Sequence, residues 1–176
     1  MRVMTDENET ILRSGSSYLF TQQGVARAYD WLKRLISDGK RGLVISRNHP
    51  TRVQQTYGVD CPIMWIAKST KPVGGVISLE PTRLMKIHTT ISDFIKANPG
   101  AVVLLDGLEY LVTENGFGPV MKTIQLTNEE VAMSGSYLLV PIDPRTLDSQ
   151  QMGYLEREFS LLEMKRGHDF GSESGR

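Results

Sequence analysis

AVVLLDGLEYL, residues 101–111, is the stretch that decides the fold. Its five apolar residues, 101–105, are typical of a strand that is buried on both faces of a parallel sheet. Asp106 and Gly107 end the apolar run with an acid and a residue that favours a turn. The stretch therefore predicts a central strand whose carboxyl end presents Asp106.

Similar short apolar runs flank this strand and alternate with helical patterns. The predicted strands are runs of apolar residues at 18–20, 42–46, 63–67 and 137–142. The predicted helices have apolar residues every three or four positions and span 25–37, 51–57, 82–97, 117–131 and 149–164. Residues 68–79 contain a proline and two adjacent glycines, which predicts a loop or an edge hairpin.

This alternation predicts one α/β domain with a mainly parallel central sheet and helices on both faces. We place the domain at residues 17–166, between polar, aperiodic and flexible tails at 1–16 and 167–176. The length of 176 residues fits a single domain of this kind.

The composition disfavours several classes of protein. Twenty basic residues balance twenty acidic ones, so no net charge draws the chain to nucleic acid or to an anionic membrane. The single cysteine, Cys61, cannot form an intrachain disulfide or a cysteine-clustered metal site. No apolar run approaches the roughly 20 residues of a membrane span, and residues 1–15 contain no apolar signal segment. We therefore expect a soluble, cytoplasmic protein.

Polar residues at the ends of the predicted strands form the candidate ligand-binding site. Ligands of open parallel sheets bind beyond the carboxyl ends of the strands, so side chains there can converge. Asp106 has the position that holds magnesium in nucleotide hydrolases, but acids at strand ends also accept hydrogen bonds in tight turns. The sequence leaves both roles open. The candidate residues are Arg47, His49, Asp106, Glu109 and Arg145.

The turn after the first predicted strand lacks the residues that hold phosphates. A phosphate loop has the pattern GxxxxGK followed by Ser or Thr, whose lysine and exposed backbone amides bind phosphate oxygens. Here the sequence is TQQGVARAYDWL, residues 21–32, with one glycine and no lysine. The three histidines are not clustered, which disfavours a zinc site. We therefore expect no bound nucleotide, metal or other cofactor.

Several segments together resemble the archaeal domain-of-unknown-function family 835. They are GLVISRNHP, WIAKS, AVVLLDGLEYLVTENGF, YLLVPIDPRTLD and YLEREF, and the resemblance spans residues 18–162. It implies an archaeal source and, because some members are joined to sensory modules, a signalling context. The family has no established activity, so the resemblance assigns no catalytic residue.

More distantly, the order of the elements is similar to that of RecA/KaiC-type ATPases. Residues 18–35 correspond to their phosphate loop and helix, and residues 101–106 to their magnesium-binding strand. Arg47 stands where an acidic catalytic residue would be expected. This second resemblance implies a degenerate RecA/KaiC-like three-layer domain without the phosphate loop.

Four functions are compatible with these observations to different degrees. The sequence favours a non-catalytic regulatory or adaptor domain that binds protein partners or forms a homo-oligomer such as a dimer. The alternative is a sensor that binds an anionic or nucleotide-like small molecule at the strand ends. An atypical enzyme built on Asp106 and His49 is a third hypothesis, supported only by the positions of these residues. Nucleic-acid binding is the fourth, and the zero net charge opposes it.

Overall fold

The computed structural model describes residues 11–69 and 74–162. Within these residues the strands form one six-stranded, all-parallel sheet in the order β1-β6-β5-β2-β3-β4. The strands are β1 (Ser16–Phe20), β2 (Gly42–Ser46), β3 (Ile63–Ile66), β4 (Ser78–Leu79), β5 (Val102–Asp106) and β6 (Tyr137–Pro141).

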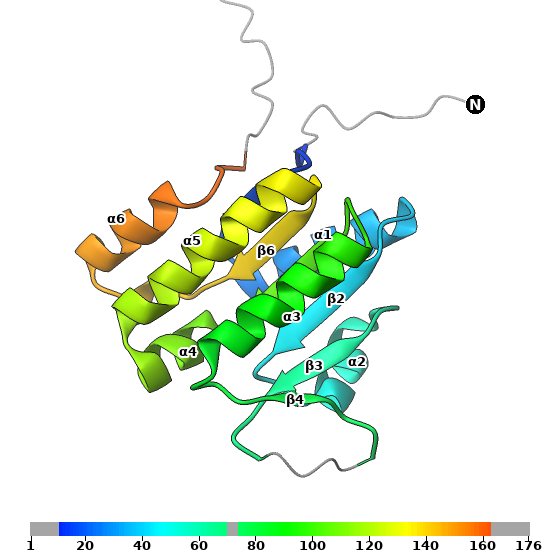
Figure 1. The fold of residues 1–176 in the computed structure, drawn as a ribbon, viewed down its shortest axis with the longest axis horizontal. Coiled ribbons are helices and arrows are strands. Elements are labelled where there is room, and N and C mark those ends of the chain that lie inside the picture. Colours follow the sequence, from blue (N-terminus) through cyan, green and yellow to red (C-terminus); the bar gives the residue numbers. More distant parts are fainter. Residues whose placement is uncertain (1–10, 70–73, 163–176) are drawn as a thin grey trace, which may run out of the picture.

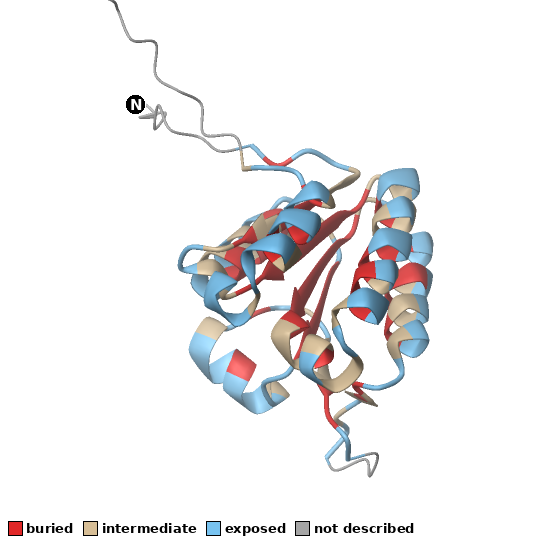
Figure 2. Cartoon of the chain, turned by 90° about the vertical axis from the view of Figure 1, so that its left-hand side faces the viewer, coloured by how far each residue is buried: buried red, intermediate tan, exposed pale blue. Residues whose placement is uncertain are grey.

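Helices cover both faces of this sheet and give the three layers that the sequence predicts (Figure 1). One face carries α1 (Gly24–Ser37) and α2 (Pro50–Tyr57). The other face carries α3 (Leu84–Ala97), α4 (Leu108–Asn115), α5 (Phe117–Ser134) and α6 (Ser149–Arg157). Figure 2 shows the buried strands between the two helical layers.

Three inner strands, β2, β5 and β6, are buried along their whole length because helices pack on both of their faces. Successive side chains of β5 point to opposite faces, so they enter different cores. Val103 packs in the cluster under α3 and α5, and Leu104 packs in the cluster under α1 and α2. The prediction of a doubly covered strand at 101–105 is therefore confirmed.

The described residues contain one α-helix that the sequence did not predict, besides the single 3-10 turn at Pro144–Thr146. α4 follows β5 directly, and Gly107, with φ 138°, makes the sharp turn between them. The helix is short, and only Leu108 and Leu111 are buried, so its apolar pattern is too sparse to indicate a helix. Gly116, with φ 84°, separates it from α5.

Two other segments differ from the sequence prediction. The last helix ends at Arg157 rather than Met164, because the chain then pairs with the edge strand β1 through a 2.7 Å bond from the Ser160 amide to the Ser17 carbonyl. The segment after β3 forms no edge hairpin in its described part. It returns to run parallel to β3, where the Trp65 amide donates to the Ile77 carbonyl at 2.9 Å.

The packed part of the chain begins before residue 17. Leu12 is buried in the core under α1, and the Gly15 amide donates to the Ser136 carbonyl at 2.8 Å. The mostly polar, aperiodic sequence of residues 1–16 gave no signal for the burial of Leu12. Residues 1–10 and the predicted tail at 167–176 lie outside the described residues. No helix in the described ranges is both long and apolar enough to cross a membrane.

The sheet topology creates two positions at the carboxyl edge where neighbouring strands lead to opposite faces. β1 leads to α1 and its neighbour β6 leads to α6, on the other face. β2 leads to α2 and its neighbour β5 leads to α4, again on opposite faces. Ligands of open α/β sheets bind at such crevices, so the candidate site divides naturally into two parts.

Candidate functional site

Asp106 lies at the crevice between β5 and β2 and is 9% exposed. It stands opposite Ser46 in the sheet, and its carbonyl accepts a 2.8 Å hydrogen bond from the Arg47 amide. The hydroxyls of Ser46 and Tyr29 both lie 3.4 Å from its Oδ2 atom as donors. Asp106 therefore accepts hydrogen bonds from other side chains of the protein. This is the structural one of the two roles that the sequence left open for it.

The surroundings of Asp106 favour its protonated form. Burial, and secondarily the charge of Glu109, raises the pKa of Asp106 to about 6, while the two hydroxyl donors lower it. Burial and the charge of Asp106 raise the pKa of Tyr29, so this hydroxyl stays protonated and donates. No group of three or more His, Cys, Asp or Glu side chains within 11–69 and 74–162 is arranged to hold a metal ion.

Arg47 lies beside Asp106 on the surface and is held by aromatic groups. Its guanidinium carbon lies 4.2 Å from the centroid of the Tyr110 ring, and its Nη1 atom donates to the Ile66 carbonyl at 3.1 Å. The Trp65 indole N–H donates back to the Arg47 carbonyl at 3.0 Å. Arg47 is exposed, so its remaining N–H groups face solvent.

His49 belongs to the same surface but has a structural partner. Its Nδ1 atom accepts a 3.2 Å hydrogen bond from the Thr51 amide and so caps the start of α2. Its ring meets the Trp65 ring edge-on at a centroid distance of 5.0 Å. We name the group Arg47, His49, Trp65 and Tyr110 the arginine–aromatic cluster.

Glu109 and Arg145 lie together at the other crevice, between β1 and β6. They line a cavity of about 380 Å³ that also includes Gln23, Gly24 and Asp143. Glu109 accepts a 2.8 Å hydrogen bond from the Asp143 amide. Arg145 is bound to Asp143 at 2.6 Å, and this contact lowers the pKa of Asp143 to about 2. The cavity is thus lined by two carboxylates, Glu109 and Asp143, and by one arginine, Arg145, which already forms an ion pair with Asp143.

The turn between β1 and α1 consists of Thr21, Gln22 and Gln23. Gln23 adopts a left-handed conformation, φ 47°, and no side chain caps the start of α1. The side chain of Arg27 folds back toward the turn, where Nη1 lies 3.4 Å from the Gln22 carbonyl. This turn is too short to wrap a row of phosphates, and it offers no lysine.

The structure therefore separates the predicted site residues into two groups. Arg47, His49 and Asp106 meet near β2 and β5, whereas Glu109 and Arg145 meet near β1 and β6.

A further cavity beside the first group contains residues that the sequence analysis missed. It has a volume of about 390 Å³ and is lined by Asn48, Arg52, Val53, Thr56 and Tyr57. The Tyr57 ring stacks on Tyr29 at a centroid distance of 3.9 Å, so the cavity adjoins the Asp106 network. The helical spacing of Arg52 and Thr56 on α2 was the available signal, but it is equally typical of an exposed helix face.

Comparison with solved structures confirms the fold. A KaiC-like protein from the hyperthermophilic archaeon Pyrococcus horikoshii OT3 aligns with a TM-score of 0.58 and 12% identity, covering 83% of this chain and 70% of that chain. A second protein from Pyrococcus horikoshii OT3 aligns with a TM-score of 0.54 and 14% identity, covering 90% of both chains. The flagellar accessory protein FlaH from Methanocaldococcus jannaschii aligns with a TM-score of 0.56 and 10% identity, covering 85% of this chain and 71% of that chain.

At such low identities the likeness shows a shared KaiC-like, RecA-like α/β fold and nothing about activity. No curated protein matches the chain. A family model, described as a protein of unknown function (DUF835), matches residues 18–159. The chain therefore belongs to the DUF835 family.

Proposed function

We propose that this domain is a non-catalytic regulatory or adaptor module that has the KaiC-like fold and binds a protein partner. The observation that carries the proposal is the crevice between β1 and β6. Its turn lacks a lysine, and its cavity contributes the carboxylates of Glu109 and Asp143 against one arginine that Asp143 already binds. A triphosphate placed there would meet like charges and few donors, which opposes nucleotide hydrolysis.

The arginine–aromatic cluster supports partner binding at the neighbouring crevice. Tryptophan, tyrosine and arginine are the residues that most often dominate the binding energy of protein interfaces. Here Tyr110 holds the Arg47 guanidinium in place while Arg47 remains exposed, so less side-chain entropy is lost on binding. This surface is therefore the best candidate for the contact with a partner.

Absence of nucleotide binding is the first test of the proposal. Calorimetry with ATP and magnesium should give no saturable heat at millimolar nucleotide, and no phosphate should be released. Affinity in the micromolar range, or steady turnover, would refute a non-catalytic role.

Partner binding is tested separately with matched surface variants. The first step compares which proteins of the source organism are captured by wild type, by Arg47→Ala and by the exposed control Lys86→Ala. Each captured protein is then purified and titrated against the three forms. We expect Arg47→Ala to lower the affinity for a purified partner by about tenfold or more, whereas Lys86→Ala should leave this affinity unchanged. Equal binding by all three proteins would exclude the arginine–aromatic cluster as the interface.

A second candidate function, a sensor for a small anion, is favoured by the cavity at α2. Its lining contains Arg52 and no carboxylate side chain, in contrast to the cavity at β1 and β6. The Arg52 side chain makes no hydrogen bond or ion pair to another residue in the described ranges. Phosphate, AMP and cyclic dinucleotides should be screened by thermal shift, because a ligand at 100 times its Kd adds about 2.7 kcal/mol of stability. A ligand-induced shift in melting temperature that is the same in Arg52→Gln as in wild type would show that the ligand binds outside this cavity.

A further inference from the structure

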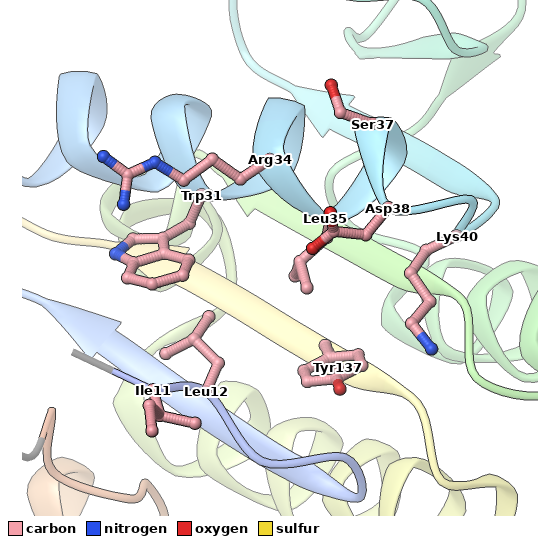
Figure 3. Close-up of a pocket in the computed structure, with 9 residues that line it drawn as sticks. All are labelled: Ile11, Leu12, Trp31, Arg34, Leu35, Ser37, Asp38, Lys40 and Tyr137. Carbon is pink, nitrogen blue, oxygen red and sulfur yellow. The ribbon is translucent and has the colours of Figure 1, made fainter. Parts of the chain in front are cut away.

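A cavity of about 610 Å³ lies at the opposite edge of the sheet, where α1 ends and β6 begins (Figure 3). It is larger than the cavities of about 380 and 390 Å³ at the carboxyl edge. Its volume falls within the range of about 300–1,000 Å³ that is usual for small-molecule sites. Neither crevice of the proposed function contributes to it, so its role is a separate question.

One part of this cavity is apolar and aromatic. Leu12 and Leu35 are buried there, at 8% and 7% exposure, and Trp31 is half-buried against the same cluster. The Arg34 guanidinium carbon lies 4.9 Å from the Trp31 ring centroid, within the range of a cation–π contact. In Figure 3, Trp31, Leu12 and Ile11 group at one end of the cavity, with Leu35 toward its middle. These side chains can cover the body of an apolar ligand.

The end of the cavity away from Trp31 carries one acidic and one basic side chain, and neither is paired with a group of the described residues. Asp38 and Lys40 follow the end of α1 and line the cavity together with the Tyr137 ring (Figure 3). Neither charged side chain forms an ion pair or a hydrogen bond with another residue of 11–69 or 74–162. Burial, then Tyr18 and then Asp38, raises the pKa of Tyr137, so its hydroxyl is a neutral donor and acceptor at neutral pH.

We propose that this cavity binds a free α-amino acid with a large apolar side chain. The ligand's carboxylate pairs with the Lys40 ammonium, its ammonium group pairs with the Asp38 carboxylate, and its side chain packs against Trp31 and the leucines. A simple organic anion would pair with Lys40 but would lie near the negative charge of Asp38, and a simple amine would pair with Asp38 but would lie near the positive charge of Lys40. Arg34, the third charged residue of the lining, lies over the Trp31 ring at the apolar end. A zwitterion that carries both charges on one carbon satisfies the pair.

Four ligands of related shape separate these requirements. L-Phenylalanine has all three features, phenethylamine lacks the carboxylate, 3-phenylpropanoate lacks the ammonium group, and L-alanine lacks the ring. The full chain with Trp65→Phe retains Trp31 as its single tryptophan, so the emission of Trp31 reports occupation of the cavity. We expect a saturable change with L-phenylalanine and affinities about tenfold weaker for each ligand that lacks one feature. Calorimetry on the unmodified chain should give the same order.

Variants assign the contacts. Lys40→Met should weaken L-phenylalanine binding about tenfold but should not weaken phenethylamine binding, because it removes a charge that repels the amine. Asp38→Asn should likewise weaken L-phenylalanine binding but not 3-phenylpropanoate binding. The exposed Lys122→Met on α5 is the control and should alter none of these affinities. Three results would overturn the proposal: no saturable binding of L-phenylalanine at millimolar concentration, equal affinity for 3-phenylpropanoate, or binding that neither Lys40→Met nor Asp38→Asn changes.

Discussion

At the scale of single residues, Asp106 shows how burial turns an acid into a pH-dependent element of stability. Its pKa is raised from 3.8 to about 6, so the folded state binds the proton more tightly than the unfolded state. Stability from this group is therefore complete below pH 4 and is lost as the pH rises toward and through about 6, by up to about 3 kcal/mol.

Asp106→Asn removes this titration. We expect the free energy of unfolding of wild type, relative to Asp106→Asn, to fall by up to about 3 kcal/mol between pH 4 and pH 7. Urea denaturation at several pH values measures this difference. The exposed Asp93→Asn is the control, and its pH profile of stability should stay close to that of wild type. Parallel profiles for wild type and Asp106→Asn would show that Asp106 titrates normally.

Gly107 is the residue that allows β5 to turn directly into α4. Its φ of 138° is strained for any residue with a Cβ atom, and an added Cβ would lie 3.0 Å from the Arg47 Cβ. Gly107→Ala should therefore lower stability by about 1–3 kcal/mol. Gly153→Ala in α6, where an added Cβ meets nothing within 4 Å, should instead raise stability by about 0.5–1 kcal/mol. Thermal melts compare the two, and equal melting temperatures would contradict the strain at Gly107.

At the scale of elements, the edge strand β1 depends on contacts from α5 and from the segment after α6. Asn128 on α5 accepts from the Ser17 hydroxyl at 2.6 Å and donates to the Glu158 carbonyl at 2.7 Å. It thereby holds residues 158–160 against β1, where the Ser160 amide pairs with Ser17. Covering an edge strand in this way reduces its tendency to pair with other chains.

Asn128→Ala should loosen this segment. Loss of two partly buried hydrogen bonds should lower stability by about 1–3 kcal/mol and speed hydrogen exchange at the Ser160 amide. Gln125→Ala removes only an exposed bond to the Glu158 side chain and should change stability by less than about 0.5 kcal/mol. Unchanged exchange at Ser160 in Asn128→Ala would show that the segment is held by other contacts.

At the scale of the whole molecule, one sheet joins two hydrophobic cores. Ile95 is fully buried on the face of α3 and α5, and Leu32 is fully buried on the face of α1. Because the strands supply side chains to both cores, neither core can open without exposing the sheet. The domain should therefore unfold in a single cooperative transition.

Ile95→Ala and Leu32→Ala should each lower stability by about 2–5 kcal/mol. In the Trp65→Phe background, Trp31 fluorescence reports the α1 face, whereas far-UV circular dichroism reports all elements. We expect the two signals to give the same midpoint in both variants. A lower midpoint for Trp31 in Leu32→Ala alone would show that the two cores unfold separately.

The amino-acid sequence by itself determined the layered fold and the absence of a phosphate loop. Both are local properties, because burial on two faces shows as a run such as 42–46, and phosphate binding needs particular residues in one turn. The tertiary structure alone decided which polar groups meet. Tyr29 reaches Asp106 across 77 positions, and Leu12, Trp31 and Tyr137 join in one cavity, because strand order brings distant segments together. Local periodicity reports which face of an element is buried, but it carries no information about the partner across the interface.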